Sequence, residues 1–282
     1  MNYINNDFKR IIGYIGGFIL FFAPFALFQK AILFVLGQHD IPTIHTLCLR
    51  IPIEHILNGK FFYMGTVAVI STIILLIVAF FFGPLFCGKL CPAGALPEYL
   101  SKIVPNSLKI EWSKYLPMTA LRAGFLAGFL LAPMWGGYLA CSYCNFYVLD
   151  LFINYIFCGY TVAFSGSLIL TGILWFFVFG IFTKGGRGFC NFFCPVGALQ
   201  SLLYVIAIKF GIAKRLQINS AKCIGCGLCM AKCPMDAVHL TGKTARIAIY
   251  QCILCEECMQ KCPSKAINYK RKAVSANEKR TV

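Results

Sequence analysis

The sequence has few charged residues and few acidic residues in particular. Among its 282 residues are ten Asp and Glu against 26 Lys and Arg, and charged residues make up only 13% of the chain. Hydrophobic residues reach 59%, whereas a soluble protein is usually ~45–50% apolar. Because the excess lies in long runs, the composition argues against an ordinary soluble domain and predicts a membrane protein.

Other absences exclude further classes. Neither G-x-G-x-x-G nor G-x4-G-K-[ST] occurs, so no nucleotide-binding fingerprint is present. The first apolar run, Ile11 to Phe28, is too long for the core of a cleavable signal peptide, and no small-residue cleavage site follows it. We expect it to remain as an anchor. The net charge of +16 would suggest nucleic acid in a soluble chain, but here the basic residues collect beside apolar runs, which predicts no nucleic-acid partner.

Cysteine, by contrast, is abundant: the chain has 16, and eight of them form two matching runs. Both runs read C-x2-C-x2-C-x3-C-P, which is the spacing of bacterial two-cluster ferredoxins. The first run is Cys223-Ile-Gly-Cys226-Gly-Leu-Cys229-Met-Ala-Lys-Cys233-Pro234, and the second is Cys252-Ile-Leu-Cys255-Glu-Glu-Cys258-Met-Gln-Lys-Cys262-Pro263.

This spacing predicts which cysteines bind which cluster. A tight loop places three thiolates around one cubane, and the fourth, next to proline, reaches across to the other cluster. Zinc sites close on paired C-x2-C units, and disulfides need an oxidising compartment, so both alternatives fit less well. The predicted ligands are Cys223, Cys226, Cys229 and Cys262 for one [4Fe–4S] cluster, and Cys252, Cys255, Cys258 and Cys233 for the other.

A second motif, C-x3-C-P-x-G-A-L, also occurs twice. Its two cysteines are Cys87 and Cys91 in the first copy and Cys190 and Cys194 in the second. Two thiolates from each copy would supply four ligands at a pseudo-two-fold axis, enough for a third iron–sulfur or metal centre. The alternative is structural: small thiols at a helix end, where Gly and Pro make the turn.

The hydropathy pattern predicts a membrane α-helical fold of four transmembrane helices, arranged as two repeated helix pairs, followed by a small α+β two-[4Fe–4S] ferredoxin-like domain. The expected domains are residues 1–216 (transmembrane), 217–270 (ferredoxin) and 271–282 (basic tail). The expected spans are residues 11–28, 64–86, 118–140 and 162–182, each about long enough to cross a bilayer.

Basic residues lie mainly on the motif side of these spans. The positive-inside rule therefore predicts a multi-pass protein of the cytoplasmic membrane, with both termini, both motifs and the ferredoxin domain in the cytoplasm. The loop between the first two spans contains His39, His45 and His55, which either take protons from a quinol or are simply solvated. The remaining cysteines are expected on the outer side, as a redox pair, as metal ligands or as small hydrophobic residues: Cys48, Cys141, Cys144 and Cys158.

Membrane spans with two C-x3-C-P motifs, followed by a two-cluster ferredoxin, resemble the NapH/NosR/CcoG group of membrane ferredoxin-type proteins, and size and layout are most similar to the NapH branch. The resemblance rests on Cys87, Cys91, Cys190, Cys194 and the eight ferredoxin cysteines. It implies electron transfer between a quinol and a partner iron–sulfur protein or cytochrome. The chain departs from the group's other branches in lacking a large outer flavin-bearing domain and a long C-terminal extension.

We therefore expect a membrane-bound electron-transfer subunit of the quinol dehydrogenase type, in contact with lipid and with quinol or quinone. An alternative is a redox protein for assembly or regulation of a metalloenzyme. A third is a membrane scaffold whose clusters hold the fold or sense oxygen.

Overall fold

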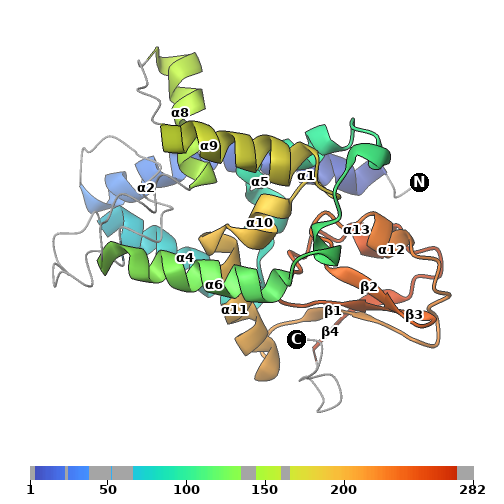
Figure 1. The fold of residues 1–282 in the computed structure, drawn as a ribbon. Coiled ribbons are helices and arrows are strands. Elements are labelled where there is room, and N and C mark those ends of the chain that lie inside the picture. The colour runs from blue at the N-terminus through green and yellow to red at the C-terminus, as the bar shows by residue number, and fades with distance from the viewer. Residues whose placement is uncertain are drawn as a thin grey trace.

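The computed structural model describes residues 4–22, 25–37, 52, 66–134, 144–159 and 166–271. A helical part comes first in the chain. A small part of short strands and short helices follows, and it packs against one end of the helical part (Figure 1). The cysteine runs at residues 223–262 lie in the second part, which we call the ferredoxin part.

The prediction of four membrane-spanning helices, and with it the predicted multi-pass membrane localisation, is wrong for the described residues. None of the helices in these ranges is both long enough and apolar enough to cross a bilayer. The apolar runs of the sequence are divided differently from the expected spans.

The helix α1 (Ile4–Phe21) has 18 residues but starts in a charged segment that contains Asp7, Lys9 and Arg10. The helix α4 (Thr66–Phe82) is apolar throughout. It stops where Gly83 takes a left-handed conformation with φ of 80° and Pro84 follows, because neither residue continues a helix easily.

The third and fourth expected spans also differ from the helices that the structure describes. The helix α6 (Met118–Leu131) passes into a 3-10 turn at Ala132–Met134, which contains a proline. The helix α9 (Gly166–Ile173) continues as the π-helical segment η6 (Leu174–Ile181). The other helical elements are α2 (Leu27–Leu36), η2 (Phe86–Leu90, a π-turn), α5 (Pro92–Ser101), η3 (Asn106–Leu108), η4 (Trp112–Lys114), α8 (Asn145–Cys158), α10 (Gly188–Phe192) and α11 (Pro195–Lys209).

The two motif copies pack reciprocally. The helix α5, which begins within the first motif, lies against η6, which precedes the second motif. The helix α11, which begins within the second motif, lies against α4, which precedes the first. Buried aromatic side chains fill the space between them, and the indole Nε1 of Trp175 donates a 3.1 Å hydrogen bond to the carbonyl oxygen of Ala93. Each half of the repeat is therefore completed by the other.

The ferredoxin part contains two antiparallel strand pairs. Strand β1 (Arg215–Ile218) pairs with β4 (Ile267–Lys270), and β2 (Val238–Thr241) pairs with β3 (Thr244–Ile247). The short helices α12 (Leu228–Ala231) and α13 (Glu257–Gln260) lie within the two cysteine runs and contain Cys229 and Cys258. The apolar core of this part extends to Cys87 and Cys190 of the helical part, so the two parts share buried surface.

Candidate iron–sulfur centres

Four cysteines from both ferredoxin runs line one small pocket. They are Cys223, Cys226, Cys229 and Cys262, the set that the spacing predicts for a single cluster. Gly225 and Gly227 have positive φ values of 68° and 75° and turn the loop tightly around the pocket. The structure therefore brings this predicted ligand set together.

The second predicted set also gathers. Cys233 belongs to the first run in sequence, yet it lies beside Cys252 and Cys255 of the second. Burial raises the pKa of the Cys233 thiol, and the neighbouring Cys255 and Cys252 raise it further. Burial likewise raises the pKa of Cys258, with Cys233 as the next contributor. The crossing of the fourth cysteine between the two runs is thus present in the fold.

Backbone amides hold both crossing cysteines in the same way. The N–H of Ala237 donates to Cys233 Sγ at 3.2 Å, and the N–H of Ala266 donates to Cys262 Sγ at 3.3 Å. In each case the amide lies four residues after the cysteine. Hydrogen bonds to cluster-binding sulfurs are one of the ways by which a protein sets a cluster's reduction potential.

The four motif cysteines, Cys87, Cys91, Cys190 and Cys194, form a third group. Cys91 and Cys194 are buried, and Cys87 and Cys190 are partly buried. Burial raises the pKa of the Cys91 thiol to about 11, with Arg187 opposing the shift and Cys194 of the other motif copy adding to it. The four thiols therefore lie in one electrostatic environment, although they come from segments about a hundred residues apart.

The two copies have the same local backbone. Cys91 stands at the N-terminus of α5 with φ −76° and ψ 105°, and Cys194 stands at the N-terminus of α11 with φ −75° and ψ 108°. Each cysteine precedes a proline, which favours this extended conformation and is itself well suited to the first helical position. Both sulfurs thus lie at the positive end of a helix, where backbone N–H groups oppose the rise in thiol pKa that burial causes.

Two glycines make reciprocal contacts across the group. A Cβ on Gly94 of the first copy would lie 2.8 Å from Arg187 Nη1 and 3.2 Å from Cys190 Sγ. A Cβ on Gly197 of the second copy would lie 3.4 Å from Arg122 Nη2 and 3.7 Å from Cys87 Sγ. Each motif glycine therefore faces an arginine and a cysteine, and at Gly94 the approach of Arg187 is too close for a Cβ.

Arg187 belongs to a buried charge network. Its Nε donates to Glu98 Oε2 at 2.5 Å, and its Nη1 donates to the Cys87 carbonyl oxygen at 2.5 Å. Arg10 binds the same Glu98 carboxylate at 2.8 Å and also donates to Glu257 of the ferredoxin part. Burial would raise the pKa of Glu98, but the charges of Arg187 and Arg10 outweigh it and hold the pKa below its ordinary value.

Arg122 is the second arginine at the motif cysteines, and its surroundings differ. Its Nη1 donates to the Tyr250 carbonyl oxygen at 2.5 Å, and its Nη2 donates to Ser201 Oγ at 3.1 Å. Its Nε is buried without a hydrogen-bond partner. No carboxylate pairs with this guanidinium among the residues that the structure describes, so its positive charge is available to a negative group at Cys87, Cys190 and Cys194.

The donor set at the motif cysteines fits an iron–sulfur cluster. Within the described ranges, no three His, Cys, Asp or Glu side chains lie close enough together to hold a single metal ion. A [4Fe–4S] cluster instead binds each thiolate to a different iron, so its cysteines stand farther apart. Four thiolates around such a cluster leave a net negative charge, and the guanidinium groups of Arg122 and Arg187 lie beside these thiols.

The other cysteines and the histidines singled out in the sequence do not belong to these three cysteine groups as the structure describes them. Cys48, Cys141 and the three loop histidines His39, His45 and His55 lie outside the described residues. Cys144 lies at the start of α8 and packs against the aromatic core of the helical part, and Cys158 is the last residue of α8.

Glu98 and Glu257 were not predicted from the sequence, and Arg10, Arg122 and Arg187 counted there only as basic residues on the motif side of the expected spans. One signal was available: Arg122 stands alone in a long apolar run, and a charge in such a place needs a partner.

Comparisons with known proteins agree with this geometry. The model of a 4Fe-4S binding domain matches residues 64–111 and again residues 167–213, with the same offset that separates Cys87 from Cys190. The model of a 4Fe-4S dicluster domain matches residues 215–263. The chain therefore carries ferredoxin-type 4Fe–4S domains, which confirms the broader part of the resemblance.

Similar proteins come from an archaeon and a bacterium. Two uncharacterized proteins of Methanocaldococcus jannaschii are 30% identical over 182 residues (60% of this chain and 58% of that protein) and 29% identical over 185 residues (63% and 70%). The methylamine utilization ferredoxin-type protein MauN of Methylobacillus flagellatus is 26% identical over 172 residues (61% and 56%). The chain thus spans less than two thirds of two of these relatives. No solved structure matches, and the narrower resemblance to NapH stays a prediction.

Proposed function

We propose that this is an iron–sulfur electron-transfer protein with three [4Fe–4S] clusters. Two would lie in the ferredoxin part, and the third would lie between the two motif copies. The observation that carries the proposal is the contact between the motif cysteines (the third group) and the set of Cys233, Cys252, Cys255 and Cys258 (the second group). Cys87 packs into the apolar core that contains Cys252 and Cys255, and Gly88 lies against the backbone of Ile253 between them.

When bound, [4Fe–4S] clusters supply one-electron redox centres, whose potentials depend on net charge, on hydrogen bonds to sulfur and on exposure to water. The protein's residues provide each of these. Arg122 and Arg187 place positive charge at the motif cysteines. The amides of Ala237 and Ala266 bind the sulfurs of the crossing cysteines. The shared apolar core keeps water from the second and third groups.

The group formed by Cys223, Cys226, Cys229 and Cys262 is open to a partner. Cys226 is exposed, and the neighbouring Ile224 and Leu228 are 68% and 45% exposed. An exposed apolar rim beside a cluster suits the docking of a partner iron–sulfur protein or cytochrome. From the resemblance, we propose a quinol as the electron source at the other end of the protein.

Iron and acid-labile sulfide analysis of anaerobically purified protein tests the cluster content. We expect about twelve irons per chain, four for each cluster. Cys190→Ser should lower the content to about eight irons by removing one [4Fe–4S] ligand, whereas the matched variant Cys144→Ser should leave it unchanged. About eight irons in the unaltered protein would overturn the third cluster.

Reduction followed by electron paramagnetic resonance tests the function. Addition of a quinol should reduce at least one cluster, and a quinone-site inhibitor should block this. If dithionite reduces the clusters reversibly while quinol has no effect, the quinol is not the donor. Clusters that no reductant reduces reversibly would overturn electron transfer itself.

A further inference from the structure

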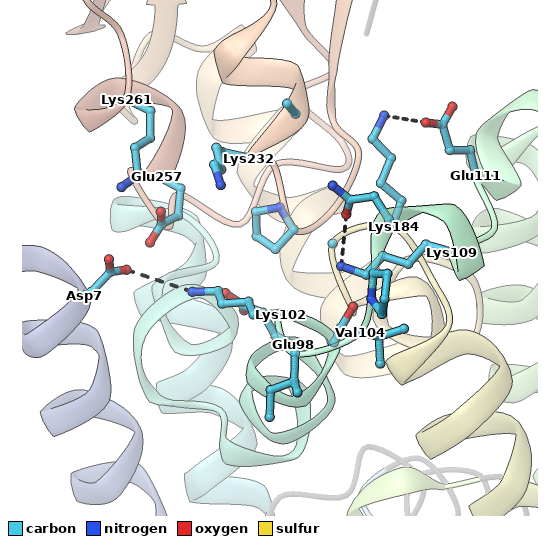
Figure 2. A pocket seen from close by; sticks show the side chains of 17 residues that line it. Asp7, Glu98, Lys102, Val104, Lys109, Glu111, Lys184, Lys232, Glu257 and Lys261 are labelled. Atoms are coloured by element: carbon cyan, nitrogen blue, oxygen red, sulfur yellow. Dashed lines mark hydrogen bonds and ion pairs between the residues drawn. The ribbon is translucent and has the colours of Figure 1, made fainter.

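A cavity of about 760 Å³ lies where the helical part meets the ferredoxin part (Figure 2). This volume is in the range of roughly 300–1,000 Å³ that small-molecule sites occupy. One wall comes from the end of α5 and the segment that follows it, together with the turn at Lys184. The opposite wall comes from the ends of α12 and α13.

Positive charge exceeds available negative charge around this cavity. Four acidic residues line it, but each already has a cationic partner: Asp7 with Lys102, Glu111 with Lys114 and Lys184, Glu98 with Arg10 and Arg187, and Glu257 with Arg10. Five lysines line the same space: Lys102 and Lys184 are two of the partners just named, and the others are Lys109, Lys232 and Lys261.

Lys109 and Lys232 face the cavity from opposite walls, the first from the helical part and the second from the ferredoxin part (Figure 2). Lys109 Nζ donates to Asn106 Oδ1 at 3.2 Å, a neutral acceptor that leaves its charge uncompensated. Partial burial lowers the pKa of Lys109, and the like charge of Lys232 lowers it further. Two ammonium groups that repel one another across a cavity are a favourable place for an anion.

We propose that this cavity binds a phosphate-bearing small molecule, with its phosphate between Lys109 and Lys232. A phosphate group carries up to two negative charges and offers oxygen acceptors to donors on both walls at once, and lysine binds it as a point charge. The apolar side chains of Ile103, Val104 and Pro234 line the remaining surface and suit the organic portion of such a ligand.

The position of the cavity gives this ligand a second effect, which rests on the proposed function. Lys232 and Pro234 stand on either side of Cys233, and Glu257 precedes Cys258, so a bound phosphate lies next to two predicted cluster ligands. Its negative charge disfavours the reduced cluster. The ligand should therefore shift the potential of that cluster to a more negative value and, by linkage, bind the reduced protein more weakly.

Isothermal titration calorimetry on the full chain, with inorganic triphosphate and with ATP as probes, tests the binding. We expect saturable binding of one molecule per chain and at least a ten-fold loss of affinity in Lys109→Gln and in Lys232→Gln. Lys243→Gln, which removes an exposed lysine of the β2–β3 turn outside the cavity, should bind as the unaltered protein does. Equal affinity for the two probes would identify an inorganic polyphosphate as the ligand class, and tighter binding of ATP would identify a nucleotide.

Absence of saturable binding by either probe would overturn the inference, and so would unchanged affinity in the double variant Lys109→Gln/Lys232→Gln. This outcome is separate from failure of the proposed function. Binding that persists while the protein contains about eight irons would leave the cavity's role intact and remove only the third cluster.

Discussion

Gly88 of the first motif lies directly on the carbonyl group of Ile253, where a Cβ would come within 2.2 Å of the oxygen. Gly88 follows Cys87, and Ile253 stands between Cys252 and Cys255. The peptide chains of two predicted cluster sites therefore touch, and no side chain separates them at this point. The arginines Arg10 and Arg122 bind residues of the ferredoxin part across the same interface.

Substitution of Gly88 tests this contact. Gly88→Ala should destabilise the protein by about 1–3 kcal/mol, because a backbone oxygen cannot move away as a flexible side chain could. Electron exchange between the clusters proposed at the motif cysteines and at Cys252 and Cys255 should slow, because the added methyl group displaces the loop around Ile253. Chemical denaturation and freeze-quench electron paramagnetic resonance measure the two effects. Gly124→Ala is the control, since a Cβ there meets nothing within 4 Å; equal behaviour of both variants would contradict the contact.

The pH dependence of stability tests Glu98. Its folded-state pKa is lowered, because Arg187 and Arg10 outweigh the effect of burial. The stabilisation is therefore complete above the unfolded-state pKa of roughly 4.3 and is lost as the pH falls through the lower folded-state value. Glu98→Gln should cost about 3–5 kcal/mol near neutral pH, since two buried guanidinium groups lose their carboxylate.

Denaturation between pH 3 and pH 7 measures this effect. The Glu98→Gln variant should show a shallower loss of stability on acidification than the unaltered protein. Glu111→Gln removes a more exposed carboxylate, which pairs with Lys114 and Lys184. Its pH profile should differ little from that of the unaltered protein. Parallel pH profiles for the unaltered protein and Glu98→Gln would argue against the charge network.

Arg122 should set the potential of the third cluster. A unit charge about 6–8 Å away at an effective dielectric constant of 20 interacts by about 2–3 kcal/mol. For a one-electron couple this is on the order of 100 mV. Redox titration of Arg122→Gln should therefore show one cluster at a more negative potential, with the iron content unchanged.

The conservative variant Arg122→Lys should keep the reduction potential of the third cluster close to that of the unaltered protein. If both variants lose iron to the same extent and neither shifts a potential, Arg122 has only a structural role.

Substitution of the crossing cysteines tests the pairing in the ferredoxin part. Cys262→Ser should perturb the cluster held by Cys223, Cys226 and Cys229, and Cys233→Ser should perturb the other. Electron paramagnetic resonance of the reduced variants distinguishes the two, because the exposed cluster differs in environment from the buried one. Loss of the same signal in both variants would contradict the assignment.

The cysteine groups could be proposed from the sequence because cluster ligation imposes fixed spacings on the chain. The C-x2-C-x2-C-x3-C-P runs identified both ferredoxin sets, including the crossing of Cys233 and Cys262, and the structure brings each set together. The repeated C-x3-C-P motif likewise marks the four thiols of the helical part that lie in one electrostatic environment. That these sets bind clusters stays a prediction.

Hydropathy was a poorer guide to the helices. It gives no information about where a helix starts or stops, and the runs at residues 11–28 and 64–86 became α1 and α4 with other bounds. Much of the apolar sequence is used in packing α5 on η6 and α11 on α4. The network around Glu98 could not be predicted, because its members Arg10 and Arg187 are distant in sequence and meet only in the folded chain.

The reciprocal contacts of Gly94 with Cys190 and of Gly197 with Cys87 have a consequence for a chain with only one copy of the repeat. Such contacts, in which each unit offers the other the same surface, are those of an isologous homodimer. A single copy presents two thiols and half of the aromatic core, and it could complete both by pairing with an identical molecule. Duplication and fusion of that unit would join the two subunits, after which only one of them needs to carry the ferredoxin part.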